Sequence, residues 1–203
     1  MVIVSLFPFL QKDMGMTDAQ CGFLVSAVYW AILIFSFPVS ILVDRWSRTK
    51  SISIMAALWS MATLACAFTK NFSQLIITRA AIGIGEAGYA PGGTAMLSAN
   101  FPREKRARIL GLWNASIPLG SALGIGIGGY VAHQFGWRHA FGLVAFPGLI
   151  LAIMFYFVKD YKTIQLTKKE KNGKQIKMQF IDMARQFTHN KTLLCNNLAF
   201  ALN

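Results

Sequence analysis

Acidic residues are scarce in this chain. Asp and Glu number 8 among 203 residues, Lys and Arg number 20, and charged residues make up only 14% of the total. Soluble domains carry roughly a quarter charged residues, whereas 55% of this chain is apolar. The composition therefore excludes a soluble enzyme and a disordered tail.

Cysteine is equally sparse. The chain has an odd number of cysteines, with neither metal-ligand spacing nor a disulfide framework: Cys21, Cys66 and Cys195. They are predicted to be small buried hydrophobic residues. This excludes a secreted domain built on disulfides, and no metal site and no cofactor are expected.

Long uncharged runs dominate the first 158 residues. A helix needs about 20 apolar residues to cross the hydrocarbon core of a bilayer, and four uncharged runs have 19 to 24 residues. The sequence therefore predicts an all-α membrane protein with an N-terminal bundle over residues 1–158. The expected spans are about 1–10 (a truncated first helix), 22–43, 51–69, 72–101, 109–132 and 139–158.

The remaining chain is polar at first. Residues 159–191 are rich in lysine and predict a basic cytoplasmic linker between two bundles, and residues 192–203 predict the start of a seventh span. Within the linker, apolar residues recur at helical spacing: Ile176, Phe180, Met183 and Phe187. This spacing favours an amphipathic helix on the inner membrane surface, with a solvated tether as the alternative.

The distribution of Lys and Arg predicts the orientation. Loops on one side hold 16 of them and loops on the other side hold 3. Because basic residues are enriched on the cytoplasmic side, the basic loops are expected there, in a cell (inner or plasma) membrane. We expect this charge to contact anionic lipid headgroups rather than nucleic acid.

Glu86 and Arg79 are the two charges inside an expected span. A carboxylate at the centre of a membrane is costly and usually marks an ion or substrate pathway. Arg79 precedes Glu86 by seven residues, or two helical turns, and Gly83 between them is expected to leave room on the shared face. A purely structural polar pair is the alternative.

Other polar groups on the fourth and fifth spans are candidates for the same cavity. Tyr89, Asn114 and Ser116 could line it, although hydrogen bonding between helices explains each equally well. Residues 83–88 also match GxGxxG, but this dinucleotide fingerprint requires a strand before it in a soluble unit. No cofactor is therefore inferred from it.

Three segments together resemble the major facilitator superfamily. Residues 40–50 are similar to its loop between helices two and three, and Asp44, Arg45 and Arg48 match the signature while serines replace its glycines. Residues 79–87 resemble its fourth-helix signature. Residues 117–138, ending in Gly-Trp-Arg, are similar to the spinster-like and anion:cation symporter branches. The Gly-Pro pair typical of antiporters is absent.

The resemblance implies the N-terminal six-helix bundle of a twelve-helix transporter, with a C-terminal bundle as its missing partner. Asp44, Arg45 and Arg48 would form a cytoplasmic latch. Glu86 would couple transport to a proton or another ion, and Arg79 would pair with it or with a substrate anion. The expected function is secondary transport of a small organic solute, favouring organic anions. Lysolipid transport, or a non-transporting membrane subunit, remains the alternative.

Overall fold

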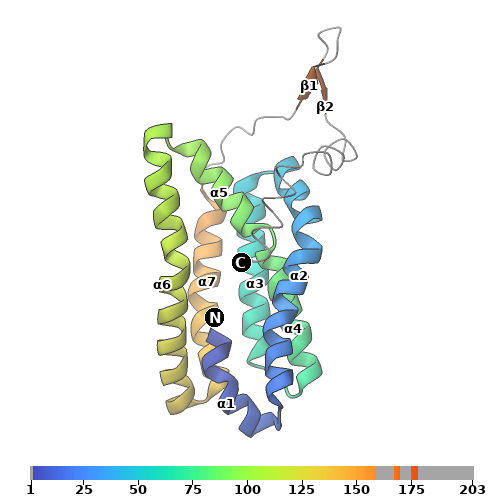
Figure 1. Cartoon of the computed structure of the whole chain (residues 1–203), viewed down its shortest axis with the longest axis vertical. Coiled ribbons are helices and arrows are strands. Elements are labelled where there is room, and N and C mark those ends of the chain that lie inside the picture. Colours follow the sequence, from blue (N-terminus) through green and yellow to red (C-terminus); the bar gives the residue numbers. More distant parts are fainter. Residues whose placement is uncertain (1, 159–166, 170–174, 178–203) are drawn as a thin grey trace. The chain divides into compact units, whose positions relative to one another are not determined.

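The computed structural model describes residues 2–158, 167–169 and 175–177, apart from the side chains of residues 41, 44 and 45 and of the strands. The chain divides into two compact units, Met1–Tyr161 and Lys162–Asn203, and each is described by itself. The first unit is a bundle of helices (Figure 1), which confirms the predicted all-α class.

Seven helices form the described part of this bundle. They are α1 (Val2–Met14), α2 (Asp18–Arg45), α3 (Arg48–Cys66), α4 (Phe72–Glu86), α5 (Tyr89–Asn100), α6 (Arg103–Phe135) and α7 (Trp137–Tyr156). Helix α6 begins six residues before the expected span at 109. The charged residues before 109 belong to the helix, although they would be costly to place in the hydrocarbon core and were therefore left out of the expected span.

The segment expected as one fourth span is two helices. A turn at Ala87 and Gly88 separates α4 from α5. Pro91 accounts for the break, because proline has no N–H to donate to the Ala87 carbonyl and its ring clashes with that carbonyl. Within the first turn of α5 this missing donor costs nothing, since first-turn N–H groups have no helical partner.

Polar side chains mark where several helices begin. Thr17 and Gln20 form a reciprocal capping box at the start of α2, with bonds of 3.3 and 3.0 Å. Ser47 and Asn71 cap α3 and α4. Helices α6 and α7 are joined at Gly136, whose φ of +90° is a conformation that only glycine adopts without strain.

Small residues let neighbouring helices approach closely. A Cβ on Gly83 would lie 2.7 Å from the Ala31 Cβ and closer still to the Val28 carbonyl, so α4 packs directly on α2. Between α3 and α7, the buried Ser53 hydroxyl donates to the Ala152 carbonyl at 2.6 Å. Such packing is typical of membrane helices, where association depends on van der Waals contact and interhelical hydrogen bonds.

The buried core draws on most of the helices. Its members include Ile3, Leu6, Leu10, Leu24, Cys66, Leu75, Ile82, Trp137 and Phe141. Cys21 and Cys66 are buried free thiols, as predicted, and Cys195 lies outside the described residues.

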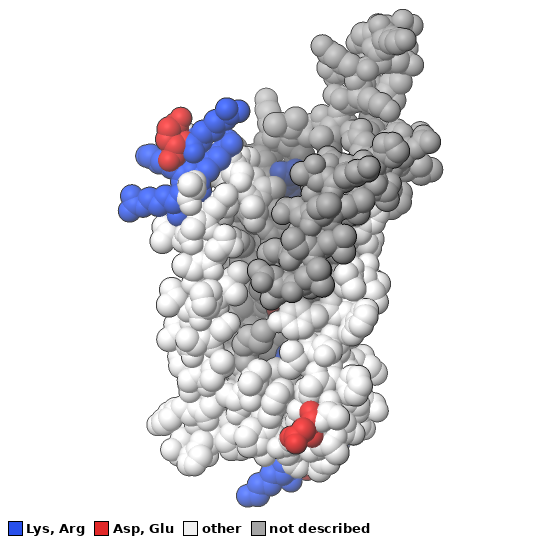
Figure 2. All heavy atoms as spheres, in the orientation of Figure 1, with Lys and Arg blue, Asp and Glu red and all other residues white. Residues whose placement is uncertain are grey.

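Three of the described helices are long and apolar enough to cross a membrane: Asp18–Ser40 within α2, Arg103–Phe135 and Trp137–Tyr156. Helices α4 and α5 are each shorter because the break divides their segment. Many large apolar side chains of α2, α6 and α7 are exposed on the bundle surface. Figure 2 shows this surface as largely uncharged between charged groups at its two ends.

The described part of the second unit is a small hairpin. Strand β1 (Thr167–Lys169) pairs antiparallel with β2 (Gln175–Lys177), with Lys168 opposite Ile176. Ile176, where the amphipathic helix was expected to begin, therefore lies in a strand. The rest of that expected helix and the start of a seventh span lie outside the described residues.

Candidate functional site

Glu86 lies at the break in the fourth segment. It is the last residue of α4, and its side chain is exposed. Counted along residues 72–100, it is close to the middle, about 21 Å from the start of α4 at 1.5 Å per residue. The carboxylate thus combines a position near the middle of the segment with an exposed side chain.

Arg79 lies two turns earlier on α4. Its side chain is half-buried, and its Nε is buried with no hydrogen-bond partner in the described structure. Arg79 and Glu86 do not form an ion pair with each other in the described structure, although their charges interact at longer range. A guanidinium with an unused N–H group can donate a hydrogen bond to a carboxylate or another anion.

Gly83 does not open space between these two charges, contrary to the expectation from the sequence. Its missing side chain is turned to α2, where the Val28 carbonyl and Ala31 fill the space that a Cβ would occupy. The reason is the tight α2–α4 packing, which uses glycine for close backbone approach.

Tyr89 stands immediately after the break, within an aromatic cluster that the sequence did not reveal. Its ring lies 4.7 Å from that of Trp59 on α3, edge to face, and 5.3 Å from that of Trp113 on α6. Gly93 makes room for the Trp113 ring, because a Cβ there would lie 2.8 Å from it. The cluster fixes α5 between α3 and α6, since aromatic pairs of this geometry are stabilising.

Asn114 follows Trp113 on α6 and has an exposed side chain. Its Nδ2 donates to the Leu110 carbonyl at 3.0 Å, and the Ser116 hydroxyl donates to the Trp113 carbonyl at 2.6 Å. Both bonds lie within α6, and within the described residues neither side chain has a hydrogen bond to another helix. The Asn114 amide oxygen is left available on the exposed surface of this helix.

The expected latch lies at the turn between α2 and α3. Asp44 and Arg45 end α2, and their side chains are outside the described part of the structure. Arg48 opens α3 and is half-buried. The latch therefore stays a prediction.

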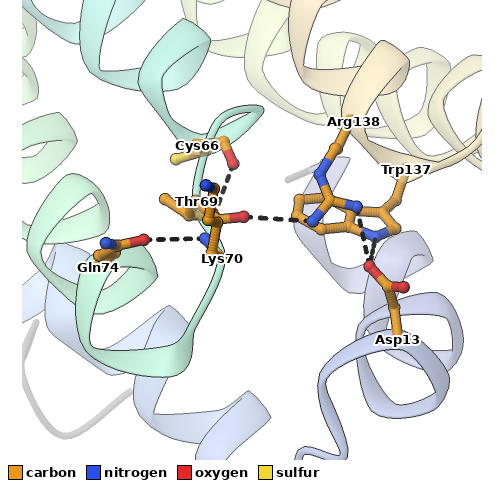
Figure 3. Close-up of polar contacts among 7 residues, drawn as sticks. All are labelled: Asp13, Cys66, Thr69, Lys70, Gln74, Trp137 and Arg138. Atoms are coloured by element: carbon orange, nitrogen blue, oxygen red, sulfur yellow. Dashed lines mark hydrogen bonds and ion pairs between the residues drawn. The ribbon is translucent and has the colours of Figure 1, made fainter.

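A second polar site joins three segments at the opposite end of the bundle (Figure 3). We call Asp13, Thr69, Trp137 and Arg138 the Asp13 cluster. Asp13 Oδ2 accepts from Trp137 Nε1 at 3.0 Å and from Arg138 Nη1 at 2.8 Å. Arg138 Nη2 donates to the Thr69 carbonyl at 3.3 Å. The cluster connects the end of α1, the α3–α4 turn and the start of α7.

The electrostatics of the Asp13 cluster favour the ionised carboxylate. The hydrogen bond from Trp137, followed by that from Arg138, lowers the pKa of Asp13 below its ordinary value. The Arg138 guanidinium also lies over the Trp137 ring, 4.1 Å from its centre, in a cation–π contact. The sequence motif included Trp137 and Arg138, but nothing in the sequence indicated Asp13, because 125 residues separate it from Arg138.

A surface pocket of about 430 Å³ opens beside this cluster. Its lining includes Phe9, Lys12, Asp13, Phe135, Gly136, Trp137, Arg138 and His139. No group of three or more potential metal ligands lies together in the part of the chain that is described.

Comparison with known proteins places this fold in a family. The chain matches the Major Facilitator Superfamily over residues 1–202. It is 31% identical over 154 residues to the hexuronate transporter of Bacillus subtilis (strain 168), covering 75% of this chain and 36% of the relative. It is 29% identical over 159 residues to protein spinster of Drosophila melanogaster, covering 78% of this chain and 26% of the relative.

A third relative is the probable galactarate/D-glucarate transporter GudP of Escherichia coli (strain K12), 27% identical over 151 residues, with 71% of this chain and 34% of the relative covered. The chain thus spans about a third of the length of these relatives. The relatives are transporters, not enzymes.

The fold is similar to that of a solved bacterial homologue of the human lysosomal transporter Spinster. In its inward-facing and occupied conformation, the TM-score is 0.67 at 22% identity, covering 76% of this chain and 39% of that chain. In the unoccupied conformation the TM-score is again 0.67, with 93% and 45% covered. The family match over nearly the whole chain and this shared helical fold lead to one conclusion: the chain belongs to the Major Facilitator Superfamily and has the N-terminal part of that multi-pass membrane fold.

Proposed function

We propose that this chain forms the N-terminal bundle of a secondary transporter that moves a small organic anion, coupled to a proton or another ion. The observation that carries the proposal is Glu86, a carboxylate at a helix break near the middle of the fourth segment. A charge at that depth is costly unless it serves a pathway or is compensated by a partner.

The break itself favours a transport role for Glu86. Discontinuous helices in transporters place unpaired backbone groups near the substrate and the coupling ion. Here Pro91 leaves the Ala87 carbonyl without its helical donor, one residue after Glu86. We propose that Glu86 takes up and releases the coupling proton at this point, where its side chain is exposed.

Arg79 is proposed to bind the anionic part of the substrate. Its Nε has no hydrogen-bond partner within the described residues, and an arginine presents donors in a fork that matches a carboxylate. Relatives named for hexuronate and for galactarate and D-glucarate support a carboxylate substrate. Tyr89 and Asn114 are proposed to line the same cavity from α5 and α6.

A lysolipid substrate is the second candidate. Protein spinster and the solved Spinster homologue support it. The exposed apolar surface of α6 is compatible with an acyl chain beside the cavity. The two candidates differ in the competitor that should block transport, a sugar acid in the first case and a lysolipid in the second.

The complete transporter needs a C-terminal bundle as its partner, because substrates bind between the two halves near the midplane. A non-transporting subunit built from this bundle alone is the third candidate. An antibody against residues 159–191 would separate these candidates by the mass of the native product. A product near twice 22.4 kDa supports the transporter, and a product at 22.4 kDa supports the subunit.

The proposed orientation places the start of α6 and the α2–α3 turn in the cytoplasm, in a cell membrane. The support is the excess of Lys and Arg in these loops. This placement brings the same loops to the anionic headgroups of the inner leaflet.

The decisive experiment is Glu86→Gln in the complete protein, reconstituted into vesicles. We expect uptake of labelled glucuronate to rise with an imposed proton gradient in the wild type and to lose this dependence in the variant, because glutamine cannot carry the proton. Glu104→Gln is the matched control, since Glu104 is an exposed carboxylate at the start of α6. A gradient-dependent rate that survives in Glu86→Gln contradicts the assignment.

Arg79→Lys and Arg79→Gln test the anion contact. The lysine variant retains a charge at this position, so we expect a raised KM, whereas the glutamine variant should lose saturable uptake. Unchanged KM values in both variants would exclude Arg79 from substrate binding.

A further inference from the structure

The start of α6 carries four cations within six residues. These are Arg103, Lys105, Arg106 and Arg108, accompanied by a single acid, Glu104. Arg103, Lys105 and Arg108 are exposed, and none of them forms an ion pair with a carboxylate in the described residues. Figure 2 shows the cluster of blue side chains that gathers at one corner of the bundle. We call these four residues the α6 collar, because at 100° per residue they point to all sides of the helix.

One member of the α6 collar is fixed in place. Arg106 is half-buried, and its Nε donates to the Phe101 carbonyl at 3.0 Å across the α5–α6 turn. This bond holds the guanidinium against the turn while its two terminal nitrogens remain as donors. Arg106 is thus the hydrogen-bonded cation of the α6 collar, and the other three cations are exposed.

Helix length sets the depth of the α6 collar in the membrane. Helix α6 has 33 residues, or about 50 Å at 1.5 Å per residue. Its uncharged run, residues 109–132, extends about 36 Å and fills the roughly 30 Å hydrocarbon core with some tilt. The six residues before this run extend about 9 Å, which is similar to the thickness of a headgroup layer. The cations therefore lie at the level of lipid phosphates.

The neighbouring turn differs from the α6 collar. At the start of α3, the Lys50 ammonium lies 5.9 Å from the centre of the Tyr156 ring. This contact directs Lys50 toward α7. Among the described side chains, the α6 collar places three exposed cations at the start of one helix, and the positive end of the α6 dipole adds to the same field.

We propose that the α6 collar is a binding site for anionic phospholipid headgroups, with Arg103, Lys105 and Arg108 contacting the phosphates and Arg106 orienting the turn. The site rests on the proposed orientation for its assignment to the cytoplasmic leaflet, but not on any transport activity. The apolar residues that follow, beginning with Ile109 and including the exposed Leu112, contact the acyl chains of the same lipids.

Native mass spectrometry of the full chain tests the site. The chain is released from nanodiscs that contain equal parts of phosphatidylglycerol and phosphatidylcholine, and the retained lipids are counted. We expect the wild type to retain phosphatidylglycerol preferentially and R103Q/K105Q to lower this preference at least about fivefold, the effect of about one basic residue near an anionic surface.

K12Q/K70Q is the matched control. It removes the same charge at the opposite end of the bundle, from two exposed lysines, and should leave the preference unchanged. Equal losses in the two double variants would mean that net charge alone sets lipid retention, and this would overturn the site. No preference in the wild type would overturn it as well.

A labelling experiment on the wild type does not depend on the folding of variants. Phosphatidylglycerol with a photoactivatable group near its headgroup should label the peptide of residues 101–113, and labelling confined to other peptides contradicts the proposal. Addition of 10 mM inorganic phosphate should not displace the lipid. Displacement would reassign the α6 collar to free phosphate. Because none of these measurements involves uptake, they stay informative if the transport proposal fails.

Discussion

At the scale of single residues, Asp13 connects the end of α1 to the start of α7. It receives hydrogen bonds from Trp137 and Arg138, and Arg138 continues to the Thr69 carbonyl. Both charged side chains are about half exposed, 49% for Asp13 and 44% for Arg138. Solvent screening therefore limits the ion pair to below about 1 kcal/mol, and the fixed indole donor adds to it.

We expect Asp13→Asn to lower thermal stability at neutral pH by an amount that disappears in acid. The pKa of Asp13 is lowered in the folded state, so the stabilisation is complete above the ordinary carboxyl pKa near 4 and is lost as the pH falls through the folded value. Melting curves of the wild type and the variant in detergent, from pH 7 to pH 2.5, measure this difference. A constant difference across that range would show that the carboxylate charge has no role.

Arg79 and Glu86 show how far residue type alone can predict a site. Charges in an apolar run predict a functional pair because the membrane penalises them. Both residues lie on α4 before the break. The prediction that Gly83 leaves room between them was wrong. Which helix faces a glycine depends on how distant segments pack, and the local sequence pattern does not contain this information.

At the scale of helices, close packing by glycine decides the arrangement. Gly83 allows α4 to contact α2, and Gly85 allows it to contact α3, where a Cβ would lie 2.8 Å from the Trp59 Cβ. Gly120 on α6 has open space around it. Glycines of the same sequence region thus have different surroundings in the structure.

We expect Gly83→Ala to destabilise the bundle by about 1–3 kcal/mol, because the added methyl meets the Val28 carbonyl and the two helices must separate. Gly120→Ala is the control within α6. It should be neutral or slightly stabilising, since alanine is the better helix former. Unfolding in mixed micelles with increasing SDS compares the two variants. A Gly83→Ala variant as stable as Gly120→Ala would contradict the close α2–α4 contact.

The break between α4 and α5 could have been read from Pro91 and Gly88. A proline inside an apolar run is compatible with either a kinked or a divided helix. The structure has two helices, and Tyr89 is held after the break by Trp59 and Trp113. These two tryptophans are distant in sequence, so the support for the divided helix is tertiary.

At the scale of the whole molecule, the expected latch concerns the balance between conformations of a complete transporter. We predict that Asp44→Asn shifts this balance and slows turnover, because the carboxylate would no longer hold neighbouring helix ends by charge contacts. The accessibility of a reporter cysteine at position 120 on α6, together with the uptake rate, measures the effect. Wild-type values for both would count against the latch.

The sequence by itself determined the class of this protein. Long uncharged runs require helices because a bilayer offers no partners for backbone polar groups, and the basic loops favour one orientation. The starts of α2, α3 and α4 also depend on local side chains, since Thr17, Ser47 and Asn71 cap them.

Only the tertiary structure decided which groups meet. It joined Asp13 to Arg138 across 125 residues, turned Gly83 to α2 and placed Tyr89 between two tryptophans. The physical reason is range: periodicity, capping and membrane insertion act within a few turns of one segment, whereas packing between segments depends on the shapes of all helices together.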